Sequence, residues 1–510
     1  MSRKVITLEP SYDVILFTDM TDYSIPIKTS GAYKIASHLR NYGHSVKVID
    51  NFVWILKNHK YDLFEYLQER IGATTLFVGF STTFMSPFKM DKFKKTRGQT
   101  KKEDSVENFS TLMNILKTQH PQTKIVLGGQ GVQTGMIFDL YKEIDHWIKG
   151  LAEDSVLDFI TKLKSGIEQP RIIEDNFLAS EYNFRESGPM FSIKDNVFQN
   201  EVLPIEISRG CRFKCKFCSY PLLGRKPSDK YIRSEESLYK ELLWNYTHFG
   251  TTQYMIMCDT FNETTEKLLS VKRAIDRIGI DINFWSYIRM DLIDAHPEQL
   301  EILRDIGIRG AFLGIESLYD PSSKAVGKGF GRENTIEMVK RMKDSWGDEV
   351  LLHGAFMIGL PHETPETATE WCELLDRREI LLDSISMNAL RIFPYQKLRQ
   401  ISTSRVFHSE FDINAEQYGY TRGKDGWRNE FWTQRSAQEF AEMWKSRFNE
   451  SAPDYLTHTL RSANLPMSLL NGGFEWEEIL KTDEPQEFQD HVKSQKLNLL
   501  NRYVENVFTK

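Results

Sequence analysis

Short apolar runs alternate with amphipathic segments through the first third of the chain. In the amphipathic segments apolar residues recur at spacings of three and four, as at Ala32, Ile35, Ala36 and Leu39, which is the period of a helix with one buried face. This alternation predicts an α/β unit, a doubly wound, Rossmann-like parallel sheet with helices on both faces. We expect its strands at residues 14–17, 46–49, 76–80 and 125–127, with a weaker strand at Trp147 and Ile148.

A second series of apolar runs and helical patterns follows in the middle of the chain. Six parallel strands joined by right-handed crossovers curl toward a partial TIM-like (βα)6 barrel. In such a sheet, chemistry is expected on the loops that leave the C-terminal ends of the strands. We predict the strands at residues 203–207, 254–257, 284–288, 311–315, 351–358 and 385–392.

The patterning divides the chain into four parts. Residues 1–165 form the predicted Rossmann unit, residues 166–200 a linker in which periodicity fades, residues 201–400 the partial barrel, and residues 401–510 a mainly helical C-terminal region. In the last part, Ser436 and Glu439 have the spacing of a capping box that opens a helix with aromatic residues on one face. We interpret this region as a helical appendage packed on the barrel, with a lid over a substrate as the second interpretation.

Composition and charge exclude several classes of protein. The 510 residues include 65 basic and 71 acidic ones, a formal net charge of −6, so no global positive field draws the chain to nucleic acid or anionic lipid. The basic segment 92–104 is interpreted as a solvated loop, because no aromatic platform accompanies it. No stretch approaches the roughly 18 apolar residues of a membrane span, and residues 1–10 have no apolar signal core. We therefore expect a cytoplasmic protein.

Cysteine usage is the most informative part of the composition. There are five cysteines, an odd number, and three of them fall within eight residues. A disulfide framework would be dense and paired, so this pattern indicates a reducing compartment. Cys258 and Cys372 are interpreted as small buried hydrophobic residues.

The clustered cysteines, Cys211, Cys215 and Cys218, follow the first strand of the second series. A structural zinc site needs four protein ligands, and the nearest later candidates, His248 and Cys258, lie far outside a zinc-ribbon spacing. Three thiolates on one tight loop suit an iron–sulfur cube with one iron left open to another ligand. The sequence thus favours an iron–sulfur site over a zinc site.

This loop resembles the signature of radical S-adenosylmethionine (radical SAM) enzymes. The resemblance rests on Cys-x3-Cys-x2-Cys, with the aromatic Phe217 before the third cysteine, and covers residues 204–394. It implies a 4Fe–4S cluster, S-adenosylmethionine bound at its open iron, and reductive cleavage to a 5′-deoxyadenosyl radical that abstracts hydrogen from a substrate. It also implies a protein reductant such as a flavodoxin or ferredoxin.

The same resemblance assigns S-adenosylmethionine contacts to the ends of the later strands. Arg289 would face the carboxylate of the methionine moiety, although a salt-bridged structural arginine is an equal alternative. Glu316 would meet a ribose hydroxyl, and His362 is interpreted as a loop residue. The predicted contacts are Phe217, Asp259, Thr260, Arg289, Glu316, Ser317, Ile358 and Gly359.

The N-terminal unit resembles the cobalamin-binding domain that precedes this barrel in one branch of the superfamily. Glycines let the backbone approach a flat macrocycle, and hydroxyls can bond its amides. No Asp-x-His-x-x-Gly motif occurs, so a histidine ligand to cobalt is unsupported, and a Rossmann unit without cobalamin is the alternative. The predicted contacts are Gly31, Ser81, Thr82, Thr83, Gly128, Gly129, Gly150 and Glu153.

The leading functional hypothesis is cobalamin-dependent methylation of an unactivated carbon by a radical SAM enzyme. One alternative keeps the radical chemistry and drops cobalamin, giving a rearrangement, oxidation or cyclisation. Another is a non-catalytic zinc-binding interaction protein. No cysteine precedes Cys211, which argues against a methylthiotransferase with a second cluster in its N-terminal domain. The sequence does not identify the substrate or the residues that act on it.

Overall fold

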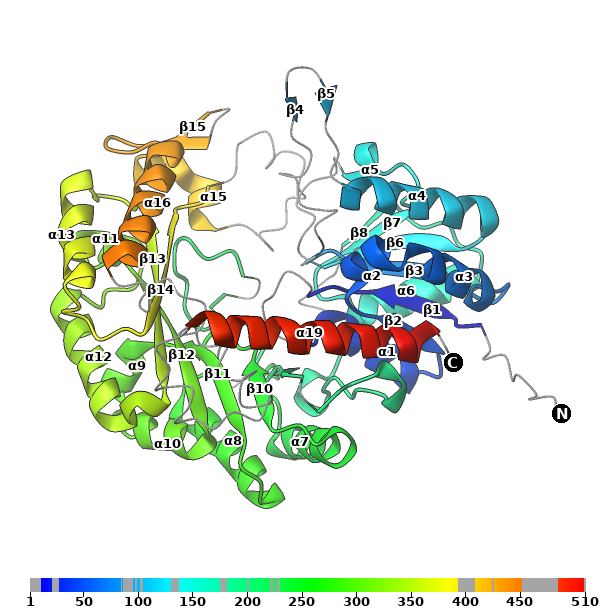
Figure 1. Cartoon of the computed structure of the whole chain (residues 1–510), viewed down its shortest axis with the longest axis horizontal. Helices are drawn as coiled ribbons and strands as arrows, with labels where there is room; N and C mark the ends of the chain where they lie inside the picture. Colours follow the sequence, from blue (N-terminus) through cyan, green and yellow to red (C-terminus); the bar gives the residue numbers. More distant parts are fainter. Residues whose placement is uncertain are drawn as a thin grey trace.

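Two parallel sheets of six strands each dominate the computed structural model of the chain (Figure 1). Among the helices that the structure describes, none combines the length and the apolar character required to cross a bilayer. The structure describes residues 11–20, 27–83, 85, 95–96, 99–100, 104–129, 137–174, 181–199, 201–220, 223–224, 226, 230–392, 409–423, 426–451 and 485–508.

The first sheet is doubly wound, as predicted. Its strand order is β2-β1-β3-β6-β7-β8, and all pairs are parallel. The chain runs outward in one direction from β1 and in the other from β3, so the ligand-binding crevice of such a sheet is expected at this switch point. The strands are β1 (Val14–Phe17), β2 (Val46–Ile49), β3 (Phe77–Ser81), β6 (Lys124–Gly128), β7 (His146–Lys149) and β8 (Ile172–Glu174).

Helices cover both faces of this sheet. Buried residues of α1 (Gly31–Asn41) and α6 (Ala152–Lys164) share one apolar core with the barrel. Buried residues of α3 (Lys60–Arg70) and α4 (Asp104–Gln119) belong to a second core on the other face. Shorter helices α2 (Phe52–Asn58) and α5 (Ile137–Leu140) join that second core.

The segment expected to be a linker has more structure than its fading periodicity indicates. Strand β8 pairs with β7 and becomes the edge of the first sheet. Two short 3-10 helices, η3 (Phe184–Glu186) and η4 (Ile193–Asp195), follow it. Arg40 of α1 forms an ion pair with Asp195 of η4, with two nitrogen–oxygen distances of 2.7 and 2.8 Å. The three residues of β8 are too few to show a hydrophobic period. Most of the basic segment 92–104 lies outside the described residues, apart from the short strands β4 (Lys95–Thr96) and β5 (Gln99–Thr100).

The second sheet runs in strict sequence order from β9 to β14, which confirms the predicted partial barrel. Helices return the chain between strands, and two of them begin at a capping hydroxyl and end at a left-handed glycine: α7 at Ser234 and Gly250, and α8 at Thr264 and Gly279. The strands are β9 (Leu203–Ile205), β10 (Gln253–Ile256), β11 (Asn283–Ile288), β12 (Ile308–Glu316), β13 (Leu351–Ile358) and β14 (Ser384–Ala389). The helices that pack outside them are α7 (Glu235–Phe249), α8 (Thr265–Ile278), α10 (Gln299–Ile306), α12 (Arg332–Trp346) and α13 (Pro365–Asp376).

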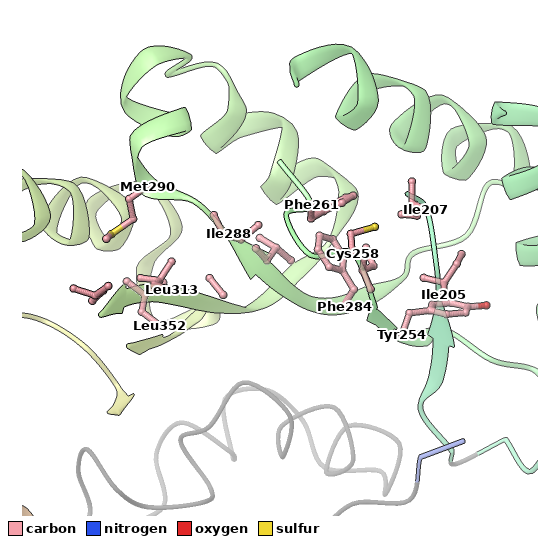
Figure 2. Packing of buried hydrophobic residues seen from close by; sticks show 14 of the residues in the cluster. Ile205, Ile207, Tyr254, Cys258, Phe261, Phe284, Ile288, Met290, Leu313 and Leu352 are labelled. Carbon is pink, nitrogen blue, oxygen red and sulfur yellow. The ribbon is translucent and has the colours of Figure 1, made fainter. Parts of the chain in front are cut away.

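Apolar side chains fill the layer between the strands and these helices (Figure 2). Cys258 lies among Phe261, Phe284 and Ile205 in this layer and is fully buried. Its sulfur accepts a hydrogen bond from the backbone of Ser208 at 3.2 Å. Cys372 is likewise buried in the core, so both of these cysteines have the predicted structural role.

The C-terminal region packs on both halves of the molecule, and not on the barrel alone as we expected. Helix α16 (Gln434–Ser451) contacts β13, β14 and α13. Its N-cap is Thr433, which exchanges hydrogen bonds with Ser436, so Ser436 occupies the third helical position and the predicted capping box was placed one turn too late. Helix α19 (Pro485–Phe508) instead lies against the first sheet, where Tyr503 and Val507 enter its core (Figure 1).

Candidate active site

The cysteine loop leaves the C-terminal end of the barrel after β9. Gly210 has a φ of 89°, so it turns the chain directly before Cys211 in a conformation that favours glycine. The loop is held by backbone bonds from Cys218 to Cys215 at 3.1 Å and from Lys216 to Val326 at 3.0 Å. Cys211 is buried, whereas Cys215 and Cys218 are half-buried.

All three cysteines line one cavity of about 440 Å³, which we call the barrel cavity. Within the described residues, no three His, Cys, Asp or Glu side chains are gathered closely enough to surround a single metal ion. A cubane makes a different demand, because each protein thiolate bonds a separate iron. The cavity is lined by three thiols of one loop, so the residues fit such a cluster.

The loop after β10 contacts the cysteine loop. The Thr260 hydroxyl lies 3.3 Å from the sulfur of Cys211. The buried ammonium of Lys267 donates to the Ser208 hydroxyl at 2.6 Å and to the Thr260 carbonyl at 2.9 Å, tying this loop to the end of β9. Asp259 lines the barrel cavity, and burial raises its pKa to about 6 against the opposing charge of Lys267. Thr260 and Asp259, both predicted to contact S-adenosylmethionine, therefore line the same cavity as the cysteines.

Arg289 follows β11 and lies beside the cysteine loop. Its guanidinium lies 3.6 Å from the sulfur of Cys215 and 3.8 Å from the centre of the Phe213 ring. It also forms a 2.6 Å ion pair with Asp291. The buried amide of Asn262 accepts from the backbone N–H of Arg289 at 2.9 Å and donates to its carbonyl, which fixes the strand end. The arginine is thus salt-bridged to Asp291, and it also lines the barrel cavity.

Glu316 ends β12 in a left-handed conformation, with a φ of 69°. Its carboxylate points into the barrel cavity and pairs with Lys328 at 3.5 Å, while Lys328 donates to the carbonyl of Gly314 at 2.8 Å. Burial raises the pKa of Glu316, and Lys328 acts in the opposite direction. Lys328 was not predicted as a site residue, although its setting between Gly327 and Gly329 in a loop was a visible signal.

Three of the predicted S-adenosylmethionine contacts do not line the barrel cavity. Ser317 donates to the carboxylate of Glu363 at 3.2 Å, and the backbone N–H of Gly359 donates to it at 2.7 Å. Ile358 is fully buried in the core. Trp371 also donates to Glu363, which has its pKa raised to about 7 by burial. Ser317, Gly359 and Trp371 therefore bind Glu363 in the turn after β13 and do not line the barrel cavity.

A polar wall from β14 completes the barrel cavity and was missed in the sequence. Ser386 and Asn388 line it, separated by the buried Met387. His353 of β13 lies between Ser384 and Ser386, at 2.8 and 3.1 Å from their hydroxyls, and burial lowers its pKa to about 4. The period-two alternation of polar and apolar residues in β14 is the signal that identifies such a wall.

A second cavity of about 330 Å³ lies between the two sheets, and we call it the interdomain cavity. It is bounded by the C-terminal ends of β1, β3, β6 and β7 on one side and by the segment after β9 on the other. Thr82 does not line it, because its hydroxyl turns away to the carbonyl of Gly128. The other predicted cobalamin contacts line it: Gly31, Ser81, Thr83, Gly128, Gly129, Gly150 and Glu153.

The glycines of the interdomain cavity leave room for a flat ligand. A β-carbon added to Gly31 or Gly128 would meet no heavy atom within 4 Å. Gly129 has a φ of 87°, and a β-carbon there would lie 2.7 Å from the hydroxyl of Thr83. A cradle of this kind lets the backbone approach a macrocycle directly, so the residues fit the corrin that the resemblance implies.

A buried ion-pair cluster connects the two halves at the floor of the interdomain cavity. Arg209 binds Glu153 at 2.8 Å and Glu206 at 2.9 Å, and Lys34 pairs with Glu206. Arg209 belongs to the barrel side and Glu153 to α6, so the cluster joins the N-terminal unit to a residue two positions before Cys211. Burial alone raises the pKa of Glu153, but Arg209 and Lys34 hold it at about 2.

The two cavities meet beside the cysteine loop. Tyr220 and Asp259 line both of them. A group bound at the carboxyl edge of the first sheet would therefore face a group bound in the barrel, with these two side chains between them.

Comparisons in sequence identify the barrel. Residues 205–375 match the model of the radical SAM superfamily. An uncharacterized methyltransferase of Pyrococcus horikoshii is 29% identical over 159 residues, covering 31% of this chain and 33% of that protein. The hopanoid C-2 methylase of Rhodopseudomonas palustris is 24% identical, covering 56% of this chain and 54% of that protein. A putative methylthiotransferase of Methanocaldococcus jannaschii is 24% identical, covering 88% of this chain and 93% of that protein. The chain thus spans one third of the first relative and about half of the second.

Solved structures align with most of the chain. The radical S-adenosylmethionine methyltransferase TsrM of Kitasatospora setae, solved with cobalamin and a 4Fe–4S cluster bound, aligns with a TM-score of 0.58 at 16% identity, covering 95% of this chain and 100% of that one. The cobalamin-dependent S-adenosylmethionine radical enzyme OxsB aligns with a TM-score of 0.56 at 17% identity, covering 80% of this chain and 56% of that one. At these identities the likeness is one of fold.

Proposed function

Because residues 205–375 form a radical SAM domain, whose cofactors are a 4Fe–4S cluster and S-adenosylmethionine, we propose that the chain is a cobalamin-dependent radical SAM methyltransferase acting on an unactivated carbon. The observation that carries this proposal is the junction of the two cavities. The three cysteines line one cavity, the glycine cradle lines the other, and Tyr220 and Asp259 line both.

Cys211, Cys215 and Cys218 would hold the cluster, which supplies the electron that cleaves the sulfonium bond of S-adenosylmethionine. Thr260 places a hydroxyl beside the sulfur of Cys211. The guanidinium of Arg289 beside Cys215 adds positive charge there, which stabilises thiolate over thiol. The loop thus offers its sulfurs to iron from a partly buried position that restricts access of water.

The remaining walls of the barrel cavity would orient S-adenosylmethionine. Arg289 can approach its carboxylate while keeping the pair with Asp291, since a guanidinium has five N–H donors. Glu316 can accept from ribose hydroxyls, and its partner Lys328 neutralises the buried charge. Asp259 can accept from an ammonium group, because no hydrogen bond occupies its carboxylate among the described residues.

The interdomain cavity would hold cobalamin, which carries the methyl group to be transferred. Gly31 and Gly128 let the macrocycle approach the backbone, and the hydroxyls of Ser81 and Thr83 can bond its peripheral amides. None of the described residues that line this cavity is a histidine. These lining residues would therefore hold the corrin without supplying a histidine ligand to cobalt.

The distribution of cysteines favours methyl transfer over methylthio transfer. Relatives carry both names, but no cysteine precedes Cys211 in this chain to hold a second cluster. The solved structures with the same two-sheet fold include enzymes with cobalamin bound. A radical rearrangement, oxidation or cyclisation without cobalamin would leave the cradle unused.

Cobalamin binding separates the proposal from that alternative. We expect the oxygen-free protein to bind hydroxocobalamin with a visible corrinoid spectrum and one equivalent of cobalt. Gly128→Leu should reduce cobalt retention at least about tenfold, because the side chain would fill the open space beside Gly128. Gly128→Ala is the graded control with a smaller loss. Retention of cobalt by Gly128→Leu, or no cobalt in the wild-type chain, would contradict the cobalamin assignment.

A further inference from the structure

The cysteine loop and the segment that follows it carry an excess of positive charge. Between residues 209 and 230 there are seven basic residues and one acidic residue, although the whole chain has a net charge of −6. The proposed chemistry uses only Arg209 of these seven, in the ion-pair cluster. The other basic residues need a separate explanation.

Part of this charge lies on the surface beside Cys215. Arg212 and Lys214 are exposed, and Lys216 is half-buried. Helix α11 (Asp320–Ala325) adds the exposed Lys324. The two segments are joined, because Lys216 bonds the carbonyl of Val326 and a β-carbon on Gly327 would lie 3.8 Å from the Cα of Cys215. We call Arg212, Lys214, Lys216 and Lys324 the basic collar.

The charges of the basic collar are not neutralised by the fold. Over the residues that the structure places, none of its four members forms an ion pair with a carboxylate. Arg212 donates to the backbone carbonyl of Glu263 and lies over the ring of Phe213. The neighbouring cations differ, since Arg209 pairs with Glu153 and Lys328 pairs with Glu316. Uncompensated charge of one sign at a surface steers partners of the opposite sign.

We propose that the basic collar is the docking surface for an acidic one-electron carrier protein. The inference rests on the proposed function, because the reaction consumes an electron at the cysteine loop. In the transfer, the carrier is oxidised by one electron and the cluster held by the cysteines is reduced by one electron; no bond is formed or broken. Two collar residues flank Cys215 in sequence, so a carrier docked there would lie beside a thiolate that would bind the cluster.

Charge reversal with a matched control tests this surface. Lys214→Glu/Lys324→Glu removes two collar charges, and Lys142→Glu/Lys340→Glu makes the same change at exposed positions outside the collar. The probe is an acidic flavodoxin, with its dissociation constant measured at 50 and 300 mM salt. We expect the collar variant to bind about tenfold more weakly at low salt and to lose most of the salt dependence, with the control unchanged.

The two readouts distinguish failure of the collar from failure of the enzyme proposal. Flavodoxin-driven formation of 5′-deoxyadenosine should fall about tenfold in the collar variant, whereas reduction by photoexcited deazaflavin should support equal rates in both variants. Lys324→Glu alone leaves the cysteine loop unchanged and should weaken flavodoxin binding about threefold. Equal flavodoxin affinity in the collar and control variants would overturn the docking surface. So would a collar variant that binds flavodoxin normally and loses affinity only for a single-stranded oligonucleotide. No 5′-deoxyadenosine with deazaflavin in any variant would instead contradict the proposed function.

Discussion

Glu153 is a buried charged residue that connects the two halves of the site. It lies on α6 in the N-terminal unit, but its strongest partner is Arg209, two residues before Cys211. Burial acts to raise its pKa, and the charges of Arg209 and Lys34 outweigh burial and bring it to about 2. Glu153 is therefore ionised in the folded protein, and its ion pair fixes the N-terminal unit against the cysteine loop.

The pH dependence of stability tests this pair. A carboxylate whose pKa is lowered by folding stabilises the protein above its unfolded pKa, and this stabilisation is lost as the pH falls toward the folded value. Wild type should exceed Glu153→Gln in free energy of unfolding at pH 7 by about 1–3 kcal/mol, and the gap should narrow by about 1 kcal/mol at pH 4. The measurement is urea unfolding at pH 7 and pH 4. The control is Asp158→Asn, a substitution of an exposed residue on the same helix. A gap that stays constant or widens toward pH 4 would refute the ion pair.

Residues differ in how far their roles can be predicted from sequence. The cysteines and Arg289 follow strands directly, so strand prediction and the loop motif place them at one edge of the barrel. Ser317 and Gly359 also follow strands, but they turn toward the buried Glu363. A shift of one residue along the strand decides whether a side chain faces the cavity or the core. In β12 the pairing register shifts between Gly314 and Glu316, directly before Ser317. No local sequence signal marks that shift.

At the scale of elements, helix α19 forms a contact that sequence patterning did not predict. The hydroxyl of Tyr503 accepts from the backbone N–H of Asp50 at 2.8 Å and lies 3.5 Å from the carbonyl of Val48. Strand β2 is an edge strand of the first sheet, so its outer backbone groups have no neighbouring strand to bond. A side chain 453 positions away along the chain supplies the missing partner.

Removing this hydroxyl should weaken the edge without changing the core. Tyr503→Phe keeps the buried ring and loses the hydrogen bond to Asp50, so we expect a loss of about 1–2 kcal/mol in the free energy of unfolding. Amide exchange at Asp50 should accelerate by at least about tenfold. The control is Tyr61→Phe, whose ring is 73% exposed. Unchanged exchange at Asp50 would show that α19 does not protect β2.

Strands with long apolar runs were predicted well, and short or late elements were not. The five strand regions predicted for the first sheet and all six for the barrel are present. Strand β8 escaped detection because it has three residues, one of them the charged Glu174. The contact of α19 with the first sheet depends on long-range packing, which periodicity within a helix cannot reveal.

At the scale of the whole molecule, the two sheets direct their carboxyl ends toward a shared region. Each sheet alone would bind a ligand at its own edge. The ion pair between Arg209 and Glu153 and the shared core of α1, α6 and the barrel bring those edges together. The substrate is thus expected where the interdomain and barrel cavities meet, beside Tyr220 and Asp259. Sequence patterning predicted both halves, but not that Tyr220 and Asp259 line both cavities.

The central claim is that the three cysteines hold a cluster that cleaves S-adenosylmethionine reductively. The most direct measurement is 5′-deoxyadenosine formation, together with iron and zinc content, in oxygen-free protein reduced by photoexcited deazaflavin. The wild-type chain should contain about four irons, as a 4Fe–4S cluster requires, and release 5′-deoxyadenosine. Cys215→Ala should lose both, while Cys372→Ala, a change in the core, should keep both. Zinc without iron, or product formation that persists in Cys215→Ala, would contradict the claim.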